Sequence, residues 1–88
     1  MPFWVYILEC KSLTGTVTYY TGSTNNIERR LSEHRKGRGA RYTSGKRVEL
    51  MYWEEFATRR DAMRREIAIK RLPRVKKSRL IQLHIPSG

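Results

Sequence analysis

The segment Tyr20–His34 reads YTGSTNNIERRLSEH, and it combines the end of a strand, a glycine turn and the first turns of a helix. Asn25 is placed to cap the helix, and Glu28, three residues later, has the position of a capping-box acid. Positions 27, 30, 31 and 34 then have the spacing of one helix face. Since Ile27 and Leu31 are the large apolar residues of this segment, we predict that this face points to the core.

Two polar residues share that predicted core-facing side. Arg30 follows Ile27 by three positions, and His34 follows Leu31 by three positions. In one interpretation, Arg30 extends from the border of the face to solvent and His34 is an interior histidine with satisfied hydrogen bonds. In the other, both side chains belong to a site, and further polar residues should then be directed to the same place.

Composition and charge narrow the class of protein. The 88 residues are expected to form one domain, spanning 1–88, with a small core. A single cysteine, Cys10, excludes an internal disulfide and is typical of the cytoplasm, which is the expected location. No apolar run approaches the ~20 residues of a membrane span. Nineteen Lys and Arg against eight Asp and Glu leave a net charge of +11, which favours nucleic acid as the partner. A membrane surface is disfavoured, because the basic residues are not gathered on one strongly amphipathic segment.

Three strands and three helices are expected along the chain. Strands are predicted at 3–10, 17–22 and 48–56, and helices begin near 26, 59 and 75. The first strand is apolar on both faces, with Tyr6 on one and Val5 on the other, which is typical of a central strand covered on both sides. The first two strands are expected to form an antiparallel hairpin, which could place Tyr6 and Tyr20 on one sheet face.

The segment 36–47, KGRGARYTSGKR, has two interpretations. Gly37 suits the end of the preceding helix. The remainder is either a flexible solvated connector or a loop that follows a phosphate backbone, and we favour the loop. In that interpretation the nucleic-acid-binding residues are Lys36, Arg38, Arg41, Lys46 and Arg47, with Tyr42 available to stack on a base.

The helix predicted at 59–72, capped by Thr58, contains a second anomaly. Its apolar residues Ala62, Met63, Ile67 and Ile69 form a broad stripe, and Glu66 falls inside it. A carboxylate in a core-facing stripe is costly unless it is paired or binds a cation. The open alternatives are an ion pair with Arg30, a hydrogen bond from a tyrosine, or a metal ion. The last helix is expected to dock through Val75, Leu80, Ile81, Leu83 and Ile85.

Together these residues have the chemistry for phosphodiester hydrolysis. Glu66 can hold one hard divalent ion, and a single carboxylate is too few for two metals. Arg30 can neutralise charge on the phosphoryl oxygens. A phenol, from Tyr6 or Tyr20, or His34 can take a proton from water.

The same residues resemble the signature of the GIY-YIG endonuclease superfamily. Val5-Tyr6-Ile7 resembles its first half and Tyr20-Thr21-Gly22 its second. The ordered set that carries the resemblance is Tyr6, Tyr20, Gly22, Asn26, Arg30, His34 and Glu66. The chain is most similar to the small standalone bacterial members, whose biological roles are mostly unassigned. It departs from the pattern at Ser23, where repair-type members carry a lysine.

The resemblance implies an α+β fold, a three-stranded antiparallel sheet flanked by helices in the order β-β-α-β-α-α. It also implies that Tyr6 helps to activate water, that Tyr20 lines the site, and that Arg30 steadies the transition state. Glu66 would bind Mg²⁺ or Mn²⁺, and His34 would assist proton transfer.

Three functional hypotheses follow. The first is a divalent-metal-dependent endonuclease that cuts DNA with weak intrinsic sequence specificity. The second is a non-catalytic module on the same fold that binds DNA or structured RNA. The third is a subunit that a protein partner recruits to its target. The preference for DNA over RNA rests on the resemblance alone.

Overall fold

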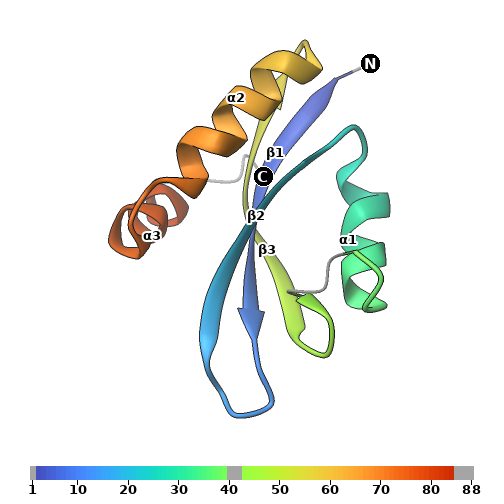
Figure 1. The fold of residues 1–88 in the computed structure, drawn as a ribbon, viewed down its shortest axis with the longest axis vertical. Helices are drawn as coiled ribbons and strands as arrows, with labels where there is room; N and C mark the ends of the chain where they lie inside the picture. The colour runs from blue at the N-terminus through green and yellow to red at the C-terminus, as the bar shows by residue number, and fades with distance from the viewer. Residues whose placement is uncertain (1, 40–42, 85–88) are drawn as a thin grey trace.

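The computed structural model describes residues 2–39 and 43–84, which form an antiparallel three-stranded sheet and three helices (Figure 1). The strands are β1 (Phe3–Lys11), β2 (Val17–Thr24) and β3 (Arg47–Phe56), and their order in the sheet is β2-β1-β3. The helices are α1 (Ile27–Arg35), α2 (Arg59–Lys70) and α3 (Arg74–Leu83). The predicted α+β fold and element order are confirmed. None of the helices in this part of the chain is long and apolar enough to cross a membrane.

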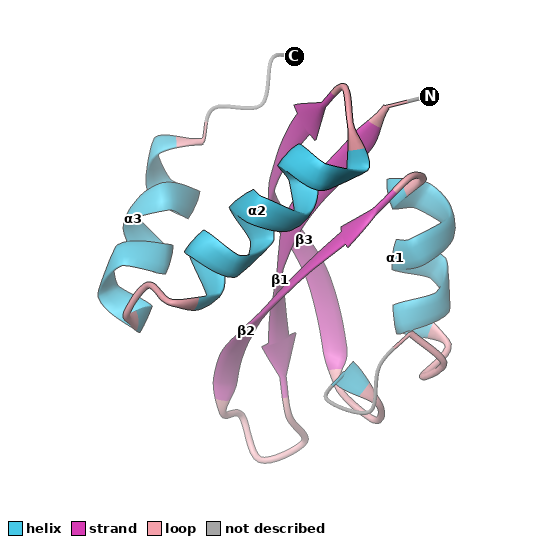
Figure 2. Cartoon of the chain, turned by 45° about the horizontal axis from the view of Figure 1, so that its top comes forward, coloured by secondary structure: helices cyan, strands magenta, loops and turns pink. Residues whose placement is uncertain are grey.

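Strand β1 is central and buried on both faces, as its composition predicts. Val5 and Ile7 belong to a core that includes residues of β3 and α2 and that α3 covers from outside. Tyr6 and Leu8 face the opposite way, into a second core that Leu31 of α1 borders. Figure 2 shows α1 on one side of the sheet and α2 and α3 on the other.

Both ends of α1 are fixed by local hydrogen bonds. The N-cap is Asn26, whose Oδ1 accepts from the Arg29 N–H at 3.0 Å, so the predicted cap Asn25 is wrong by one residue. Asn25 instead accepts a 2.9 Å bond from the Arg29 guanidinium. Gly37 follows the last turn with φ +77°, and its N–H donates to the His34 carbonyl at 3.0 Å, which confirms the predicted glycine ending.

The buried stripe of α2 is narrower than predicted. Ala62 and Ile69 are buried, whereas Met63 and Ile67 are 46% and 49% exposed. Positions 62, 66 and 69 have the i, i+4, i+7 spacing of one face, so Met63 and Ile67 lie beside the contact with the sheet rather than within it. The helix also ends at Lys70, two residues before the predicted end.

Helix α3 docks through fewer residues than expected. Leu80 and Ile81 pack against the core on the α2 side of the sheet, whereas Val75 and Leu83 are exposed. Ile85, also predicted to dock, lies outside the described residues.

Candidate active site

Tyr6 and Tyr20 lie on the same sheet face, which confirms the prediction from strand alternation. In the β1–β2 register Tyr6 pairs with Gly22 and Leu8 pairs with Tyr20, and the two phenol rings are 6.4 Å apart. Gly22 makes this arrangement possible. A Cβ at that position would lie 2.6 Å from Tyr6 Oη and 3.1 Å from Tyr20 Cε2. The glycine therefore allows the Tyr6 ring to lie across β2.

His34 links the phenol of Tyr6 to the segment after α1. Its side chain is 1% exposed, and Nε2 lies 2.9 Å from Tyr6 Oη. On the other side of the ring, Nδ1 lies 2.9 Å from Thr43 Oγ1. Burial lowers the pKa of His34, and the charge of Arg30 lowers it further. The neutral imidazole then has one nitrogen that donates and one that accepts.

Two residues that position His34 were missed by the sequence reasoning. Thr43 is fully buried and supplies the second hydrogen-bond partner of the ring. Gly39 packs directly on the imidazole, because a Cβ there would lie 2.4 Å from His34 Nδ1. Gly39 belongs to the segment that was interpreted as a loop following a phosphate backbone, which gave it no packing role, and a buried threonine has no distinctive signal.

Arg30 lies beside this hydrogen-bonded chain. Its Nη2 donates to the Gly39 carbonyl at 2.7 Å, and its Nη1 lies 3.5 Å from Glu33 Oε1. The side chain is 30% exposed, so a ligand can reach the guanidinium. Among the described residues the carboxylate partner of Arg30 is Glu33 rather than Glu66.

The phenol of Tyr6 holds its proton firmly in this environment. Burial raises the pKa of Tyr6 to about 12, and a hydrogen bond from Arg30 opposes this shift. The negative charge of Glu66 adds a smaller increase to the same pKa. At neutral pH Tyr6 is therefore a phenol, and it needs a proton acceptor before it can act as a base.

Glu66 belongs to the helix layer on the opposite side of the sheet from Arg30 and His34 (Figure 2). It belongs to α2, whereas Arg30 and His34 belong to α1. Its side chain is 20% exposed, and its Oε2 lies 2.7 Å from Lys70 Nζ. Glu66 is largely buried, as predicted for a residue that lies toward the core. Its ion-pair partner among the described residues is Lys70 rather than Arg30.

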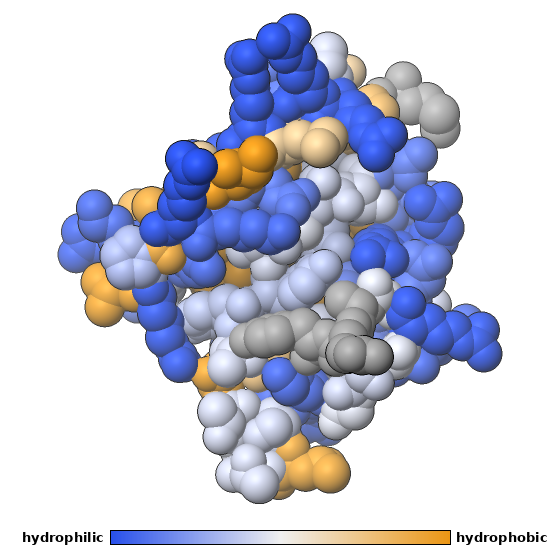
Figure 3. All heavy atoms as spheres, in the orientation of Figure 1, coloured by the Kyte–Doolittle hydropathy of each residue, from blue (hydrophilic) through white to orange (hydrophobic). Residues whose placement is uncertain are grey.

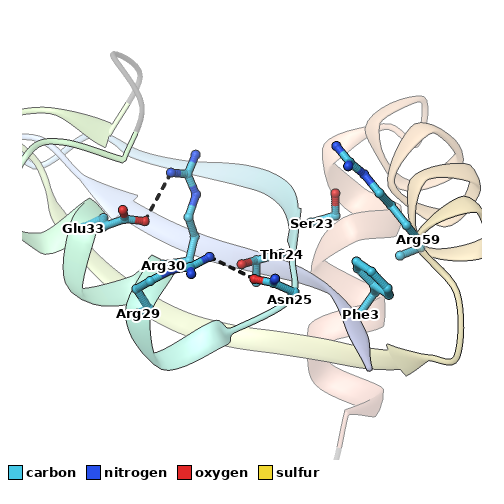
Figure 4. A pocket seen from close by; sticks show the side chains of 9 residues that line it. Phe3, Ser23, Thr24, Asn25, Arg29, Arg30, Glu33 and Arg59 are labelled. Carbon is cyan, nitrogen blue, oxygen red and sulfur yellow. Dashed lines mark hydrogen bonds and ion pairs between the residues drawn. The ribbon is translucent and has the colours of Figure 1, made fainter. Parts of the chain in front are cut away.

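A cleft of about 410 Å³ adjoins this cluster and is lined by residues of both α1 and α2. Figure 4 shows Arg29, Arg30 and Glu33 of α1 along one side, with Arg59 and Phe3 across from them. The cleft is lined by Phe3, Ser23, Thr24, Asn25, Arg29, Arg30, Glu33, Arg59 and Ala62. It is open enough to admit a ligand beside Arg30.

The donor set suits at most one hard cation. Within residues 2–39 and 43–84, no three His, Cys, Asp or Glu side chains gather as a metal cluster. Glu66 is a half-buried carboxylate that already accepts the ammonium of Lys70. Mg²⁺ is commonly held by one or two carboxylates together with waters and substrate phosphate oxygens, so Glu66 fits such an ion.

Two of the basic residues predicted in segment 36–47, Lys46 and Arg47, line a hollow that is separate from this cleft. Lys36 and Arg38 follow α1 directly, and Lys46 and Arg47 line a separate hollow with Arg35 and Glu49. Arg41 and Tyr42, also predicted to contact nucleic acid, lie outside the described residues.

The comparisons with known proteins agree with this architecture. The family model of the GIY-YIG catalytic domain matches residues 2–79. The chain belongs to the GIY-YIG family, which has a nuclease-type fold and whose nucleases generally use divalent metal ions.

Within that family, the chain is similar to UPF0213 proteins of bacteria and archaea. It is 48% identical to the UPF0213 protein of Natronomonas pharaonis over 89% of this chain and 88% of the relative. It is 44% identical to that of Oceanobacillus iheyensis over 90% and 88% of the two chains. The solution NMR structure of the UPF0213 protein BH0048 from Bacillus halodurans matches with a TM-score of 0.55 and 37% identity, over 94% of this chain and 85% of that one.

Proposed function

We propose that this protein is a divalent-metal-dependent endonuclease that hydrolyses phosphodiester bonds in DNA. The observation that carries the proposal is the buried chain Tyr6–His34–Thr43 beside the partly exposed guanidinium of Arg30. A neutral buried histidine hydrogen-bonded to a phenol provides a route for a proton. A guanidinium next to that route provides charge for a phosphate.

Each residue of the site has one proposed role in the reaction. Tyr6 passes its proton to Nε2 of His34, 2.9 Å away, and the phenolate oxygen then takes a proton from water. The resulting hydroxide attacks phosphorus, and the departing oxygen of the cleaved bond takes a proton from solvent. His34 releases to solvent the proton that it took from Tyr6, so both residues return to their neutral forms. Arg30 stabilises the charge that grows on the phosphoryl oxygens. A divalent ion held at Glu66 would polarise the phosphate and stabilise the leaving oxygen.

The basic segment after α1 supports the same proposal. Lys36, Arg38, Lys46 and Arg47 are exposed or partly exposed and are proposed to contact phosphates farther from the cut. These residues would contact phosphates and not base edges, so we expect weak sequence specificity.

A cleavage assay tests the proposal. Wild type, Arg30→Ala and Glu66→Ala are incubated with duplex, nicked, flap, branched and single-stranded DNA and with structured RNA, in Mg²⁺, Mn²⁺ or EDTA. Arg60→Ala and Glu55→Ala, two exposed residues outside the site, are the matched charge controls. We expect metal-dependent cutting that both site variants lose and both controls retain. Absence of cutting by the wild type on every substrate would refute the proposal.

A second candidate is a non-catalytic nucleic-acid-binding module. The observation that favours it is that both charged site residues already have protein partners, Arg30 with the Gly39 carbonyl and Glu66 with Lys70. A binder would keep these pairs. In that case Glu66→Ala should leave nucleic-acid affinity unchanged, and no substrate should be cut.

A further inference from the structure

We propose that the nucleic-acid backbone crosses the outer edge of β2, held by Arg59 at one end and by Lys77 at the other, with the tyrosine cluster between them. This inference rests on the proposed function, because it says where the substrate of the same site lies. It assigns binding roles to residues of α2 and α3 that the sequence analysis left unassigned.

The first observation is that two hollows follow the same edge strand. The cleft beside Arg30 is lined by Ser23 and Thr24 at the end of β2. A second hollow of about 240 Å³ is lined by Tyr19, Tyr20 and Thr21, together with Lys70 and Lys77. Because β2 is paired only with β1 in the described sheet, its other edge is not covered by a strand.

Gly22 lies between the two hollows and marks the position of the cluster. It is the residue that pairs with Tyr6, and it lies directly against that phenol. A backbone that enters one hollow and leaves through the other must therefore pass the tyrosines and Arg30. Along β2, Arg59 therefore lies at one end, the tyrosine cluster at Gly22, and Lys77 at the other end.

The spacing suits a short length of nucleic acid. From residue 19 to residue 24 a strand rises by about 17 Å, at roughly 3.3 Å per residue. A strand of B-form DNA advances about 3.4 Å per nucleotide along the helix axis, so a duplex whose axis runs parallel to β2 presents about five nucleotides to this path. With the scissile phosphate near Gly22, the Arg59 end of the path lies about two phosphates away and the Lys77 end about three.

The charges along this path are available to a phosphate. In the part of the chain that the structure describes, neither Arg59 nor Lys77 forms an ion pair. Arg29, at the cleft, donates to the neutral amide of Asn25 and keeps its charge unneutralised. Figure 4 shows the Arg59 side chain across the cleft from Arg30. In Figure 3, side chains of intermediate hydropathy occupy the middle of this face, with hydrophilic ones on both sides.

The other basic hollow is a weaker candidate for this part of the substrate. It is lined by Arg35, Lys46, Arg47, Val48 and Glu49. It contains no residue of β2 and so does not adjoin the tyrosines through that strand.

The test measures binding to a short DNA duplex in EDTA, as a function of salt concentration. Arg59→Ala is compared with its neighbour Arg60→Ala, and Lys77→Ala with Lys76→Ala. Arg60 and Lys76 are exposed and line neither hollow. The slope of log affinity against log salt concentration is negative, and each lost phosphate contact decreases its steepness by about 0.9. We expect this decrease for Arg59→Ala and Lys77→Ala and no change for the two neighbours.

The outcomes separate this inference from the proposed function. Equal slopes within each pair of neighbours would overturn the path even if the protein cuts DNA. The expected slopes without cutting would keep the path and refute the nuclease. Where the wild type cuts, a neutral methylphosphonate placed two positions from the cut, on the Arg59 side, should abolish the effect of Arg59→Ala. If Arg59→Ala has the same effect wherever the methylphosphonate is placed near the cut, the predicted contact between Arg59 and that phosphate is wrong.

Discussion

Gly39→Ala tests whether the segment after α1 holds His34 in place. The added Cβ would lie 2.4 Å from His34 Nδ1 and 2.6 Å from Cγ. The imidazole cannot move aside without losing its 2.9 Å contacts to Tyr6 and Thr43. Gly39 is not among the glycines with positive φ, so alanine adds no left-handed backbone strain. The steric clash with His34 is therefore the effect by which this substitution destabilises the folded state.

Two opposing effects set the magnitude. Alanine restricts the unfolded chain, which by itself stabilises the folded state by about 0.4–1 kcal/mol. Overpacking costs about 1–3 kcal/mol. If the segment shifts, the hydrogen bond from Arg30 to the Gly39 carbonyl is weakened as well, and bonds to charged groups contribute about 1.5–3 kcal/mol. We expect a net destabilisation of about 1–3 kcal/mol, which lowers the Tm of a domain of this size by roughly 5–20 °C.

Urea and thermal unfolding of four proteins check this reasoning. They are wild type, Gly39→Ala, His34→Ala and the double variant. Removal of the imidazole makes room for the new methyl group, so Gly39→Ala should become neutral or stabilising in the His34→Ala background. A rise in Tm for Gly39→Ala alone would refute the contact, as would the same loss of stability in both backgrounds.

Four further predictions concern α1 and the sheet face that it covers. Asn26→Ala removes the cap of α1 and should cost about 0.5–2 kcal/mol in urea unfolding, whereas an unchanged midpoint would contradict the assigned cap. Because the folded-state pKa of Tyr6 is raised to about 12, stability should fall between pH ~10 and ~12. Tyr6→Phe should reduce this loss, and the part that remains comes from Tyr52, whose pKa burial also raises. Because the folded-state pKa of His34 is lowered, stability should fall as the pH drops below ~6.5, and a pH-independent stability there would contradict its burial as a neutral ring. Thr43→Val leaves Nδ1 of His34 without its partner and should cost about 1–3 kcal/mol, while Thr43→Ser should retain most of the wild-type stability.

Much of the site could be predicted from local sequence patterns. Strand alternation places Tyr6 and Tyr20 on one face, and helix periodicity turns His34 inward, because both are properties of a few consecutive residues. Both interpretations of His34 proved compatible, since it is a satisfied interior histidine and also a neighbour of the tyrosines. Helix periodicity was less informative for α2. Its apolar residues Met63 and Ile67 lie beside the helix face that packs on the sheet, and both remain half-exposed.

The sequence by itself determined the strands, the helix containing Arg30 and His34, the strongly basic charge and the resemblance to GIY-YIG nucleases. Only the tertiary structure decided that Gly39 and Thr43 close on His34 and that Glu66 approaches from the opposite helix and pairs with Lys70. The physical reason is that periodicity says which face of an element is buried. Which distant residue meets that face depends on strand order, register and the path of the connecting segments.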